Sequence, residues 1–313
     1  MKKAIVSGSA GFVGSKLVQV LLENNVEVLA LGRKSWGDVD PSRLSENNNL
    51  TYLKIDMSES KLLSEKINEL GWSLGDDCVF FNFAWWGIDK VSDSNLKAQM
   101  NNAIWAGDAL MAVSKLKCNR FIHVGTMEEP IGKAYLDLDY KNDSEFNRHI
   151  VYALAKIASR NVIKILAKKY DIDTIIATNS HVMGPNDGKD SFLQETLIKL
   201  KNKEEELIFS TGEQLFDVIS VSDCAEAYFL IGKNGIPGSE YKIGSGEARS
   251  LKKYVEIMAE MYPSGKKLQF GKFIYNDISI KMKDFSIDLL REHTGFEPRK
   301  SYEETVKELY QTL

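Results

Sequence analysis

The chain has 313 residues, 43% of them apolar and 27% charged, and a formal net charge of −4 from 40 basic and 44 acidic residues. This is the composition of an ordinary globular protein, and its scattered basic residues argue against a nucleic acid as the main partner. No stretch approaches the roughly 20 apolar residues of a membrane span. The apolar start at Ala4 is broken at Gly8, too early for a signal peptide, so we expect a cytoplasmic protein with no membrane partner.

The cysteines are odd in number and widely spaced, with no Cys-x-x-Cys pair: Cys78, Cys118 and Cys224. This pattern disfavours a disulfide framework and a zinc site. We therefore expect buried, reduced thiols and no bound metal.

Up to residue 180, short apolar runs alternate with longer helical patterns, which is typical of βαβ units and a parallel sheet. The expected strands are Lys3–Ser7, Glu27–Leu31, Tyr52–Ile55, Cys78–Phe83, Arg120–Gly125 and Thr174–Asn179. The expected helices are Phe12–Glu23, Leu62–Leu70, Asn95–Leu116 and Val151–Tyr170. Most strands are apolar on both faces, as a sheet covered by helices on both sides requires. The sequence therefore predicts a doubly wound α/β fold.

After Gly184-Pro185 the pattern changes to helical segments separated by short strand-like runs such as Glu240–Ile243. The helical segments are Phe192–Lys201, Ser222–Gly232, Leu251–Met261 and Tyr302–Tyr310. We expect a cofactor-binding domain over residues 1–180. Residues 181–313 then form mostly a smaller substrate-binding lobe, partly woven back into the sheet.

Three glycines, Gly8, Gly11 and Gly14, lie between the first strand and the first helix, which begins with Phe12 and Val13. In a Rossmann fold such glycines permit a tight turn, a close approach of the backbone to a pyrophosphate, and close packing of helix on strand. The phosphates then lie at the positive end of the helix dipole. The sequence predicts a dinucleotide site here.

The end of the second strand indicates which dinucleotide binds. A carboxylate there would bind the 2′-hydroxyl of NAD, but the sequence has Gly32-Arg33-Lys34. Arg33, with Lys34, is expected to bind the 2′-phosphate of NADP(H), although both could be merely solvated loop cations. Asp56, followed by Met57 after the third strand, suits a contact with the adenine edge or a helix N-cap.

Tyr152 and Lys156 are four residues apart in a helical pattern and so share one face. A phenol with a pKa of about 10 is a poor acid or base near neutrality, and a neighbouring ammonium would lower that pKa. Thr126 comes directly after the fifth strand, where its hydroxyl could bond a substrate oxygen. These residues are the expected catalytic group.

The chain resembles the extended short-chain dehydrogenase/reductases, the nucleotide-sugar epimerase, dehydratase and reductase family. The matching motifs are Gly8-x-x-Gly11-x-x-Gly14, Asn82-Phe83-Ala84, Gly125-Thr126, Tyr152-x-x-x-Lys156, Gly184-Pro185, and Gly212-Glu213-Gln214 before Asp217. The resemblance implies that Thr126, Tyr152 and Lys156 are catalytic, that Lys156 also holds the nicotinamide ribose, and that Phe83 and Ala84 line the cofactor. It implies that residues after Pro185 bind a nucleoside-diphosphate sugar. It also implies a homodimer through a four-helix bundle of residues 95–116 and 151–170.

The resemblance leaves the reaction open among reductase, epimerase and 4,6-dehydratase. Dehydratases of this family have Thr-Asp-Glu after the fifth strand, where this chain has Thr126-Met127-Glu128, and Met127 cannot donate a proton. Because net reduction benefits from NADPH, we expect reduction of a 4-keto group of a nucleoside-diphosphate deoxysugar, in precursor synthesis for deoxysugars or surface polysaccharides. A 4-epimerase with retained NAD is the alternative. A non-catalytic NADP(H) sensor and a structural or RNA-associated subunit are less favoured, because the catalytic residues are intact and no basic surface is evident.

Two departures from the family pattern leave the substrate open. His181 replaces an asparagine of the family, and Phe216 stands where many relatives have an arginine that binds the diphosphate. Lys189, Arg249 or Lys283 could neutralise the phosphates instead. Trp85 and Trp86, after the fourth strand, either shape the pocket or simply pack. With Met127, Glu128, His181 and Phe192, they complete the expected substrate-binding set.

Overall fold

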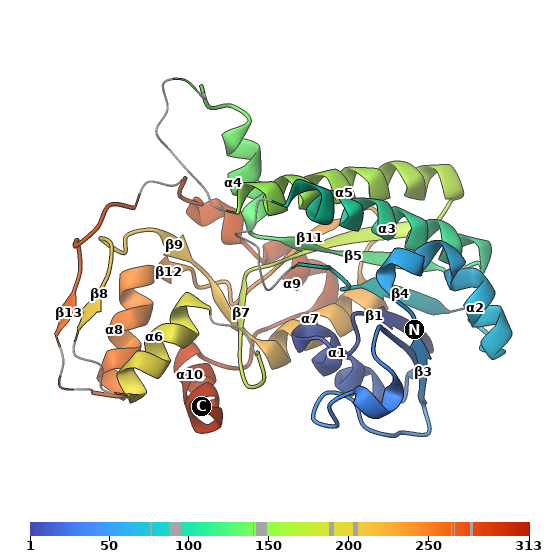
Figure 1. Ribbon diagram of the computed structural model, residues 1–313, viewed down its shortest axis with the longest axis horizontal. Helices are drawn as coiled ribbons and strands as arrows, with labels where there is room; N and C mark the ends of the chain where they lie inside the picture. The colour runs from blue at the N-terminus through green and yellow to red at the C-terminus, as the bar shows by residue number, and fades with distance from the viewer. Residues whose placement is uncertain are drawn as a thin grey trace.

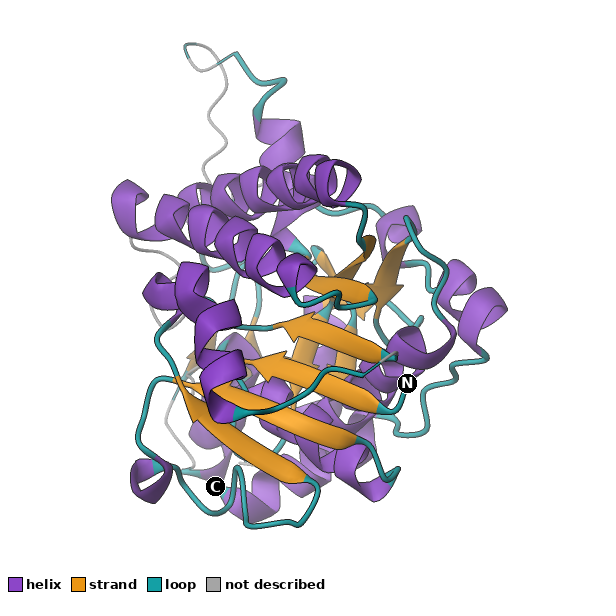
Figure 2. Ribbon diagram, turned by 90° about the vertical axis from the view of Figure 1, so that its right-hand side faces the viewer, coloured by secondary structure: helices purple, strands orange, loops and turns teal. Residues whose placement is uncertain are grey.

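The computed structural model describes residues 1–75, 77–87, 95–139, 141, 149–187, 191–202, 206–263, 265, 267–275 and 278–313. Its centre is a seven-stranded parallel sheet in the order β11-β6-β5-β4-β1-β2-β3 (Figures 1 and 2). The strands are β1 (Lys3–Ser7), β2 (Glu27–Gly32), β3 (Leu50–Lys54), β4 (Cys78–Asn82), β5 (Arg120–Thr126), β6 (Asp173–Asn179) and β11 (Glu240–Ile243). The strand order reverses between β1 and β4, the place where open parallel sheets bind ligands.

Helices cover both faces of this sheet, which confirms the doubly wound fold (Figure 2). On one face lie α1 (Phe12–Glu23), α7 (Val221–Asn234) and α9 (Asp288–Thr294). On the other lie α2 (Leu63–Leu70), α3 (Leu96–Lys115) and α5 (Ile150–Tyr170). Neighbouring strand residues point to opposite faces. Ala4 and Val6 therefore belong to one buried cluster, and Ile5 to the other.

The rest of the second half forms a separate apolar core beside the sheet (Figure 1). Its helices are α6 (Phe192–Lys201), α8 (Leu251–Met261) and α10 (Tyr302–Thr312). Three small sheets pair β7 (His181–Met183) with β10 (Val218–Ser220), β9 (Leu215–Phe216) with β12 (Arg249–Ser250), and β8 (Leu207–Ile208) with β13 (Leu268–Gln269). Two elements of this half join the main sheet and its helices: β11 pairs with β6, and α7 packs on α1. The domain boundary near residue 180 stays a prediction.

Most expected elements are present, with small shifts at their ends. The third strand begins two residues earlier than expected, at Leu50. The helix α4 (Glu128–Tyr135) was not predicted, because Pro130 was not recognised as a residue that the first turn of a helix tolerates. Short 3-10 helices lie at Trp36–Asp38 (η1), Met57–Leu62 (η2) and Met282–Phe285 (η4).

Two expectations from composition can be compared with the described residues. No helix there is both long and apolar enough to cross a membrane. Cys78, Cys118 and Cys224 are free thiols, and all three are buried.

Candidate functional site

The glycine-rich turn between β1 and α1 forms a cradle for a ligand. Gly8 has φ +66°, and a Cβ added there would lie 2.9 Å from the backbone nitrogen of Ala84. A Cβ on Gly14 would lie 2.3 Å from the carbonyl oxygen of Gly8, so neither position tolerates a side chain. Gly11 is the N-cap of α1 and has no side chain to cap it, which leaves the first-turn N–H groups to a ligand. These features fit a dinucleotide pyrophosphate.

Beyond β2 the chain presents two exposed cations. The hydroxyl of Tyr52 donates to the carbonyl of Lys34 at 2.9 Å, and the ammonium of Lys54 donates to Ser35 Oγ at 3.0 Å, so β3 holds this loop. The side chains of Arg33 and Lys34 are exposed. They form no hydrogen bond or ion pair with the described residues, and are therefore available to an anion.

Asp56 caps the 3-10 helix η2, as one of its two predicted roles requires. Its Oδ1 accepts hydrogen bonds from the backbone N–H and the hydroxyl of Ser58, at 2.9 and 2.7 Å. These bonds, with a smaller contribution from Arg33, lower the pKa of the Asp56 carboxyl. Met57 begins the same helix. A contact of Asp56 or Met57 with adenine stays a prediction.

The expected catalytic residues converge at the carboxyl end of β5. Thr126 ends that strand, and its side chain interacts with the phenol of Tyr152 of α5. Only 7% of Tyr152 and 4% of Lys156 are exposed. Lys156 Nζ donates to the carbonyl of Val124 at 3.0 Å and lies 3.8 Å from the ring centroid of Trp85. The geometry thus brings together the three residues that the sequence predicts.

The electrostatics of this group differ from the expectation. Burial raises the pKa of the Tyr152 phenol, and the interaction with Thr126 only partly opposes that rise. Burial also lowers the pKa of Lys156 to about 7, against the effect of Glu129. The expected lowering of the Tyr152 pKa by Lys156 is absent, because Lys156 bonds Val124 and its Nζ is 5.9 Å from the tyrosine ring centroid. In the free protein Tyr152 is a neutral phenol.

The two tryptophans after β4 have different surroundings. Trp85 is 9% exposed, packs edge-on against Tyr152 at 5.9 Å between ring centroids, and donates from Nε1 to Gln99 of α3 at 2.9 Å. Trp86 is 46% exposed, although Asn102 bonds its backbone. Trp85 is therefore a wall of the catalytic group, while Trp86 faces solvent.

A buried polar chain beneath the site was missed by sequence reasoning. Ser7 Oγ accepts from the N–H of Ala84 at 3.2 Å and donates to Asn82 Oδ1 at 2.9 Å. His123 then joins Asn82 to Ser159 of α5, with contacts of 3.1 and 3.0 Å at its two ring nitrogens. Burial, then Lys156 and Arg160, hold the pKa of His123 well below its usual value. The signal was a polar residue in each of three neighbouring core strands.

The expected cofactor residue Phe83 lies in the same loop after β4 as the two tryptophans, and its ring points to the opposite side of that loop. Its ring packs edge-on against Tyr228 of α7 at 4.6 Å between centroids. The Tyr228 hydroxyl in turn donates to Asn179 at the end of β6, at 2.7 Å. These contacts fix the loop that carries Phe83 and Ala84 next to the cradle.

Met127 and Glu128 follow Thr126 but point to different neighbours. Met127 packs against a buried apolar cluster of Ile131, Ile280 and Phe285. Glu128 Oε1 lies 3.1 Å from Nδ1 of His149, the residue that precedes α5. His149 was not predicted. Its position three residues before Tyr152, on the same helical face, was the available signal.

The remaining expected substrate residues lie along the second part of the molecule. Burial lowers the pKa of His181 to about 4, and its buried Nε2 has no hydrogen-bond partner in the described part of the chain. Phe192 begins α6, is 40% exposed, and packs edge-on against Phe209. A neutral His181 cannot neutralise a phosphate in the free protein.

Arg249 stands opposite Phe216 in the register of β9 and β12. Its guanidinium is already paired with Glu247 at 2.8 Å and with Glu303 at 3.6 Å. Lys283 belongs to η4 and is exposed. Lys189 lies outside the described residues.

The family motif residue Asp217 is structural in this chain. Its buried carboxylate accepts from Ser180 Oγ at 3.0 Å and from the backbone N–H of Ser245 at 3.1 Å. Burial raises its pKa, against these hydrogen bonds. Asp217 therefore ties β10 to the segment after β11.

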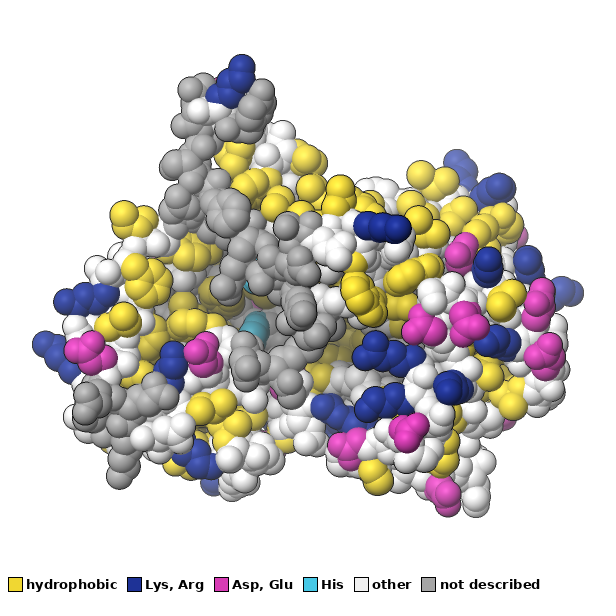
Figure 3. Space-filling model, viewed as in Figure 1, with side chains coloured by type: hydrophobic (Ala, Val, Ile, Leu, Met, Phe, Trp, Pro, Cys, Tyr) yellow, Lys and Arg dark blue, Asp and Glu magenta, His cyan; other side chains and the backbone are white. Residues whose placement is uncertain are grey.

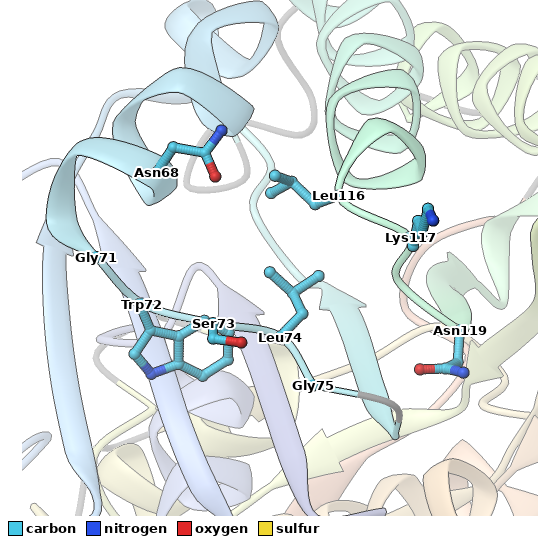
Figure 4. A pocket seen from close by; sticks show the side chains of 9 residues that line it. All are labelled: Asn68, Gly71, Trp72, Ser73, Leu74, Gly75, Leu116, Lys117 and Asn119. Atoms are coloured by element: carbon cyan, nitrogen blue, oxygen red, sulfur yellow. The ribbon is translucent and has the colours of Figure 1, made fainter.

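The space-filling view shows a hollow between the sheet and the second part of the molecule, with a histidine side chain visible in it (Figure 3). A cavity of about 750 Å³ lies elsewhere, at the amino ends of the strands (Figure 4). Trp72, Leu74 and Leu116 are among the residues that line it. Because ligands of such sheets bind at the carboxyl ends of the strands, this cavity does not belong to the candidate site. The described residues hold no group of three or more potential metal ligands.

Known proteins resemble the chain over almost its whole length. CDP-abequose synthase of Salmonella typhimurium is 26% identical, over 99% of this chain and 97% of that protein. The dTDP-D-glucose 4,6-dehydratase of Bos taurus is 23% identical, over 98% and 87%. The solved UDP-glucose 4-epimerase of Thermotoga maritima superposes with a TM-score of 0.78 at 20% identity, over 99% and 98%. Residues 4–244 match the model of the NAD dependent epimerase/dehydratase family. With the cradle and the Thr126, Tyr152 and Lys156 group in place, the chain belongs to that family.

Proposed function

We propose that the protein reduces the 4-keto group of a nucleoside-diphosphate deoxysugar with NADPH, in the synthesis of deoxysugar or surface-polysaccharide precursors. The observation that carries this proposal is the end of β2. Arg33 and Lys34 are exposed and uncommitted there, and Gly32 stands in place of a carboxylate. Two free cations suit the 2′-phosphate of NADPH, the cofactor of net reduction.

The catalytic residues suit a proton donor. When bound at the glycine cradle, NADPH supplies the hydride. The side chains of Thr126 and Tyr152 interact, so their hydroxyls are close enough to bond the same substrate carbonyl oxygen. Because burial keeps Tyr152 protonated, the residue can donate its proton to that oxygen as the alcohol forms. Lys156, anchored on Val124, can bond the nicotinamide ribose.

The substrate class follows from the relatives and from the apolar surroundings of Met127. The relatives are named for reactions of CDP-, dTDP- and UDP-linked sugars, so we assign a nucleotide sugar to this chain as well. The cluster around Met127 is mostly apolar, with Ile131, Ile280 and Phe285 at its centre, and this favours a deoxy position of the sugar. Arg249 lies opposite Phe216 in the β9–β12 pair, and we assign it to the diphosphate. To bind phosphate, its guanidinium would have to release Glu247 and Glu303.

The competing activity is a nucleotide-sugar 4-epimerase that retains NAD. A relative named putative UDP-glucose 4-epimerase, from Methanocaldococcus jannaschii, is 25% identical over 81% of this chain. Such an enzyme returns its hydride and has no need of a 2′-phosphate site. The exposed pair at Arg33 and Lys34 therefore favours the reductase.

The test incubates the purified protein and NADPH with a panel of nucleoside-diphosphate 4-keto-6-deoxy sugars and follows the absorbance of NADPH. We expect consumption with at least one sugar, and much slower consumption of NADH. An absorbance spectrum of the protein as purified is the control for retained cofactor. If no sugar consumes NADPH while a 4-hydroxy sugar is interconverted without added cofactor, the protein is the epimerase.

We also propose that the chain forms a homodimer through α3 and α5. Ile104 of α3 and Ile165 of α5 are 60% and 68% exposed, so each helix presents an apolar side chain that a second copy could cover. Ile104→Glu is expected to convert the dimer to a monomer in sedimentation velocity. Ile208→Glu, at the 52% exposed Ile208 of β8, is the matched control. A wild-type monomer would contradict the proposal.

A further inference from the structure

A buried ion pair lies directly behind the catalytic group. Glu129 of α4 is 1% exposed and Arg160 of α5 is 6% exposed, and Glu129 Oε2 lies 2.5 Å from Arg160 Nε. A buried carboxylate and guanidinium are costly to desolvate, so each depends on the other for its charge. The two residues are 31 positions apart in sequence, and one charge lies on α4 and the other on α5.

Arg160 has a partner at each of its three nitrogens, through the ion pair at Nε and hydrogen bonds at Nη1 and Nη2. Besides Glu129, its Nη2 donates to Thr178 Oγ1 of β6 at 2.9 Å, and its Nη1 bonds Glu240 Oε2 of β11 at 2.5 Å. Lys164 pairs with the same Glu240 at the exposed outer end. The two hydrogen bonds orient the guanidinium, and the ion pair at Nε keeps the carboxylate of Glu129 beside it.

Glu129 in turn holds the end of β5. Its Oε1 accepts the backbone N–H of Thr126 at 2.9 Å. The carboxylate reaches this N–H because Gly125 has no side chain. A Cβ on Gly125 would lie 2.6 Å from Glu129 Oε1 and 2.7 Å from Thr178 Oγ1. Glycine at this position therefore leaves room for the contact that orients Thr126.

Glu129 is also the negative charge that acts on Lys156. It opposes the lowering of the Lys156 pKa by burial. The other ionisable groups around Lys156 in the described residues are Tyr152 and Arg160 on its own helix and His123 on β5. The β4–α3 loop contributes the uncharged ring of Trp85. Among the described residues, Glu129 is the only carboxylate whose charge acts on the pKa of Lys156.

We propose that Glu129, held by Arg160, is a positioning residue that aims Thr126 at Tyr152 and supplies the buried negative charge beside Lys156. The inference rests on the proposed function only in that Thr126, Tyr152 and Lys156 act in catalysis. It holds equally for a reductase and an epimerase.

The first test needs no substrate. Amide hydrogen exchange is measured at Thr126 in the full chain, in Glu129→Gln and in Lys164→Gln. The glutamine cannot serve both Arg160 and the Thr126 N–H, so Thr126 is expected to exchange about tenfold faster, while Ile122 in the same strand keeps its rate. Lys164→Gln removes a charge from the outer end of the network and should leave Thr126 unchanged. Equal rates at Thr126 in all three proteins would overturn the positioning role.

The second test uses the reaction that the wild-type protein catalyses. Glu129→Gln is expected to lower kcat about tenfold or more, with KM changed less than about threefold, because a misplaced Thr126 stabilises the transition state less while the substrate contacts remain. The pH optimum should move to lower pH, since Lys156 then holds its proton only there. A merely structural defect would lower the whole profile without moving it, and that result would overturn the role of the charge.

Glu129→Asp separates the positioning of Thr126 from the charge beside Lys156. It also keeps the inference testable if Glu129→Gln fails to fold. It keeps the negative charge beside Lys156 but shortens the reach to Thr126. We expect a lower kcat with the wild-type pH optimum. If the wild-type protein consumes no NADPH with any keto sugar, the exchange experiment still decides the inference, and only the proposed function fails.

Discussion

The two ends of the candidate site work by opposite means. At the adenosine end, Arg33 and Lys34 are exposed, and their charges remain in water. At the catalytic end, Tyr152 and Lys156 are almost fully buried, and burial changes the pKa of both. The first end can select a cofactor by charge alone, whereas the second can change the proton affinity of its groups. Substitutions at the two ends should therefore alter different measurements.

The largest effect is expected from Tyr152→Phe. Removal of a general acid costs a factor of roughly 10² to 10⁴ in rate, so turnover of the keto sugar should fall by about that factor. The affinity for NADPH, measured by fluorescence titration, should stay within about twofold, because the exposed end of the site is untouched. Tyr170→Phe, on the last turn of the same helix, is the matched control. A near-normal rate in Tyr152→Phe would show that another group donates the proton.

Arg33→Ala tests the exposed end. Loss of charge-assisted hydrogen bonds to a 2′-phosphate should weaken NADPH binding about 10- to 100-fold and leave NADH binding nearly unchanged. The salt dependence of NADPH binding should also decrease, because the lost contact is solvent-exposed. Lys115→Ala, at the last turn of α3, removes a cation far from the cradle and serves as the control. Equal losses for both cofactors would contradict the assignment of Arg33 to the 2′-phosphate.

A smaller effect is expected on the free energy of unfolding, and it measures the cost of burying Lys156. Lys156 has a pKa of about 7 in the folded protein and an ordinary value of 10.5. Between these values the unfolded chain binds a proton that the folded protein does not, so the stability contributed by this residue rises with pH. Below about pH 7 both states are protonated, and the burial penalty is fully present.

Lys156→Met should therefore be more stable than the wild type at pH 6, and this advantage should shrink by about 1–3 kcal/mol at pH 9. Urea unfolding at the two pH values measures the difference. Lys164→Met, at a half-exposed position on the same helix, should show no such change. An advantage that is the same at both pH values would mean that Lys156 keeps an ordinary pKa in the folded protein.

Local patterns predicted much of the fold and of the site. The glycines of the cradle and the Tyr152–Lys156 spacing are readable because each acts within one or two turns of chain. The sequences of α4 and α9 contain residues typical of helix ends, although neither helix was predicted. In α4, Glu128 and Glu129 precede Pro130 in the first turn, and in α9, Asp288 comes first and Gly295 follows at φ +71°.

Contacts between distant segments could not be read in the same way. The Glu129–Arg160 pair and the chain through Asn82 and His123 join residues 31 to 77 positions apart. Nothing in the residues near Glu129 distinguishes it from Glu128, yet one is buried against Arg160 and the other meets His149. The raised pKa of Tyr152 was missed for the same reason, since it depends on how completely Trp85 and its neighbours cover the phenol.

The position of β11 has a consequence for how the polypeptide acquires its structure during synthesis. This strand, Glu240–Ile243, hydrogen-bonds β6 and carries Glu240, which binds Arg160. A nascent chain that has emerged only as far as β6 exposes an unpaired strand edge and leaves Nη1 of Arg160 without its partner Glu240. The ribosome must add more than sixty further residues before either is covered. Translation pauses between these points should therefore favour chaperone capture or aggregation, and a fragment ending near residue 180 should not be independently stable.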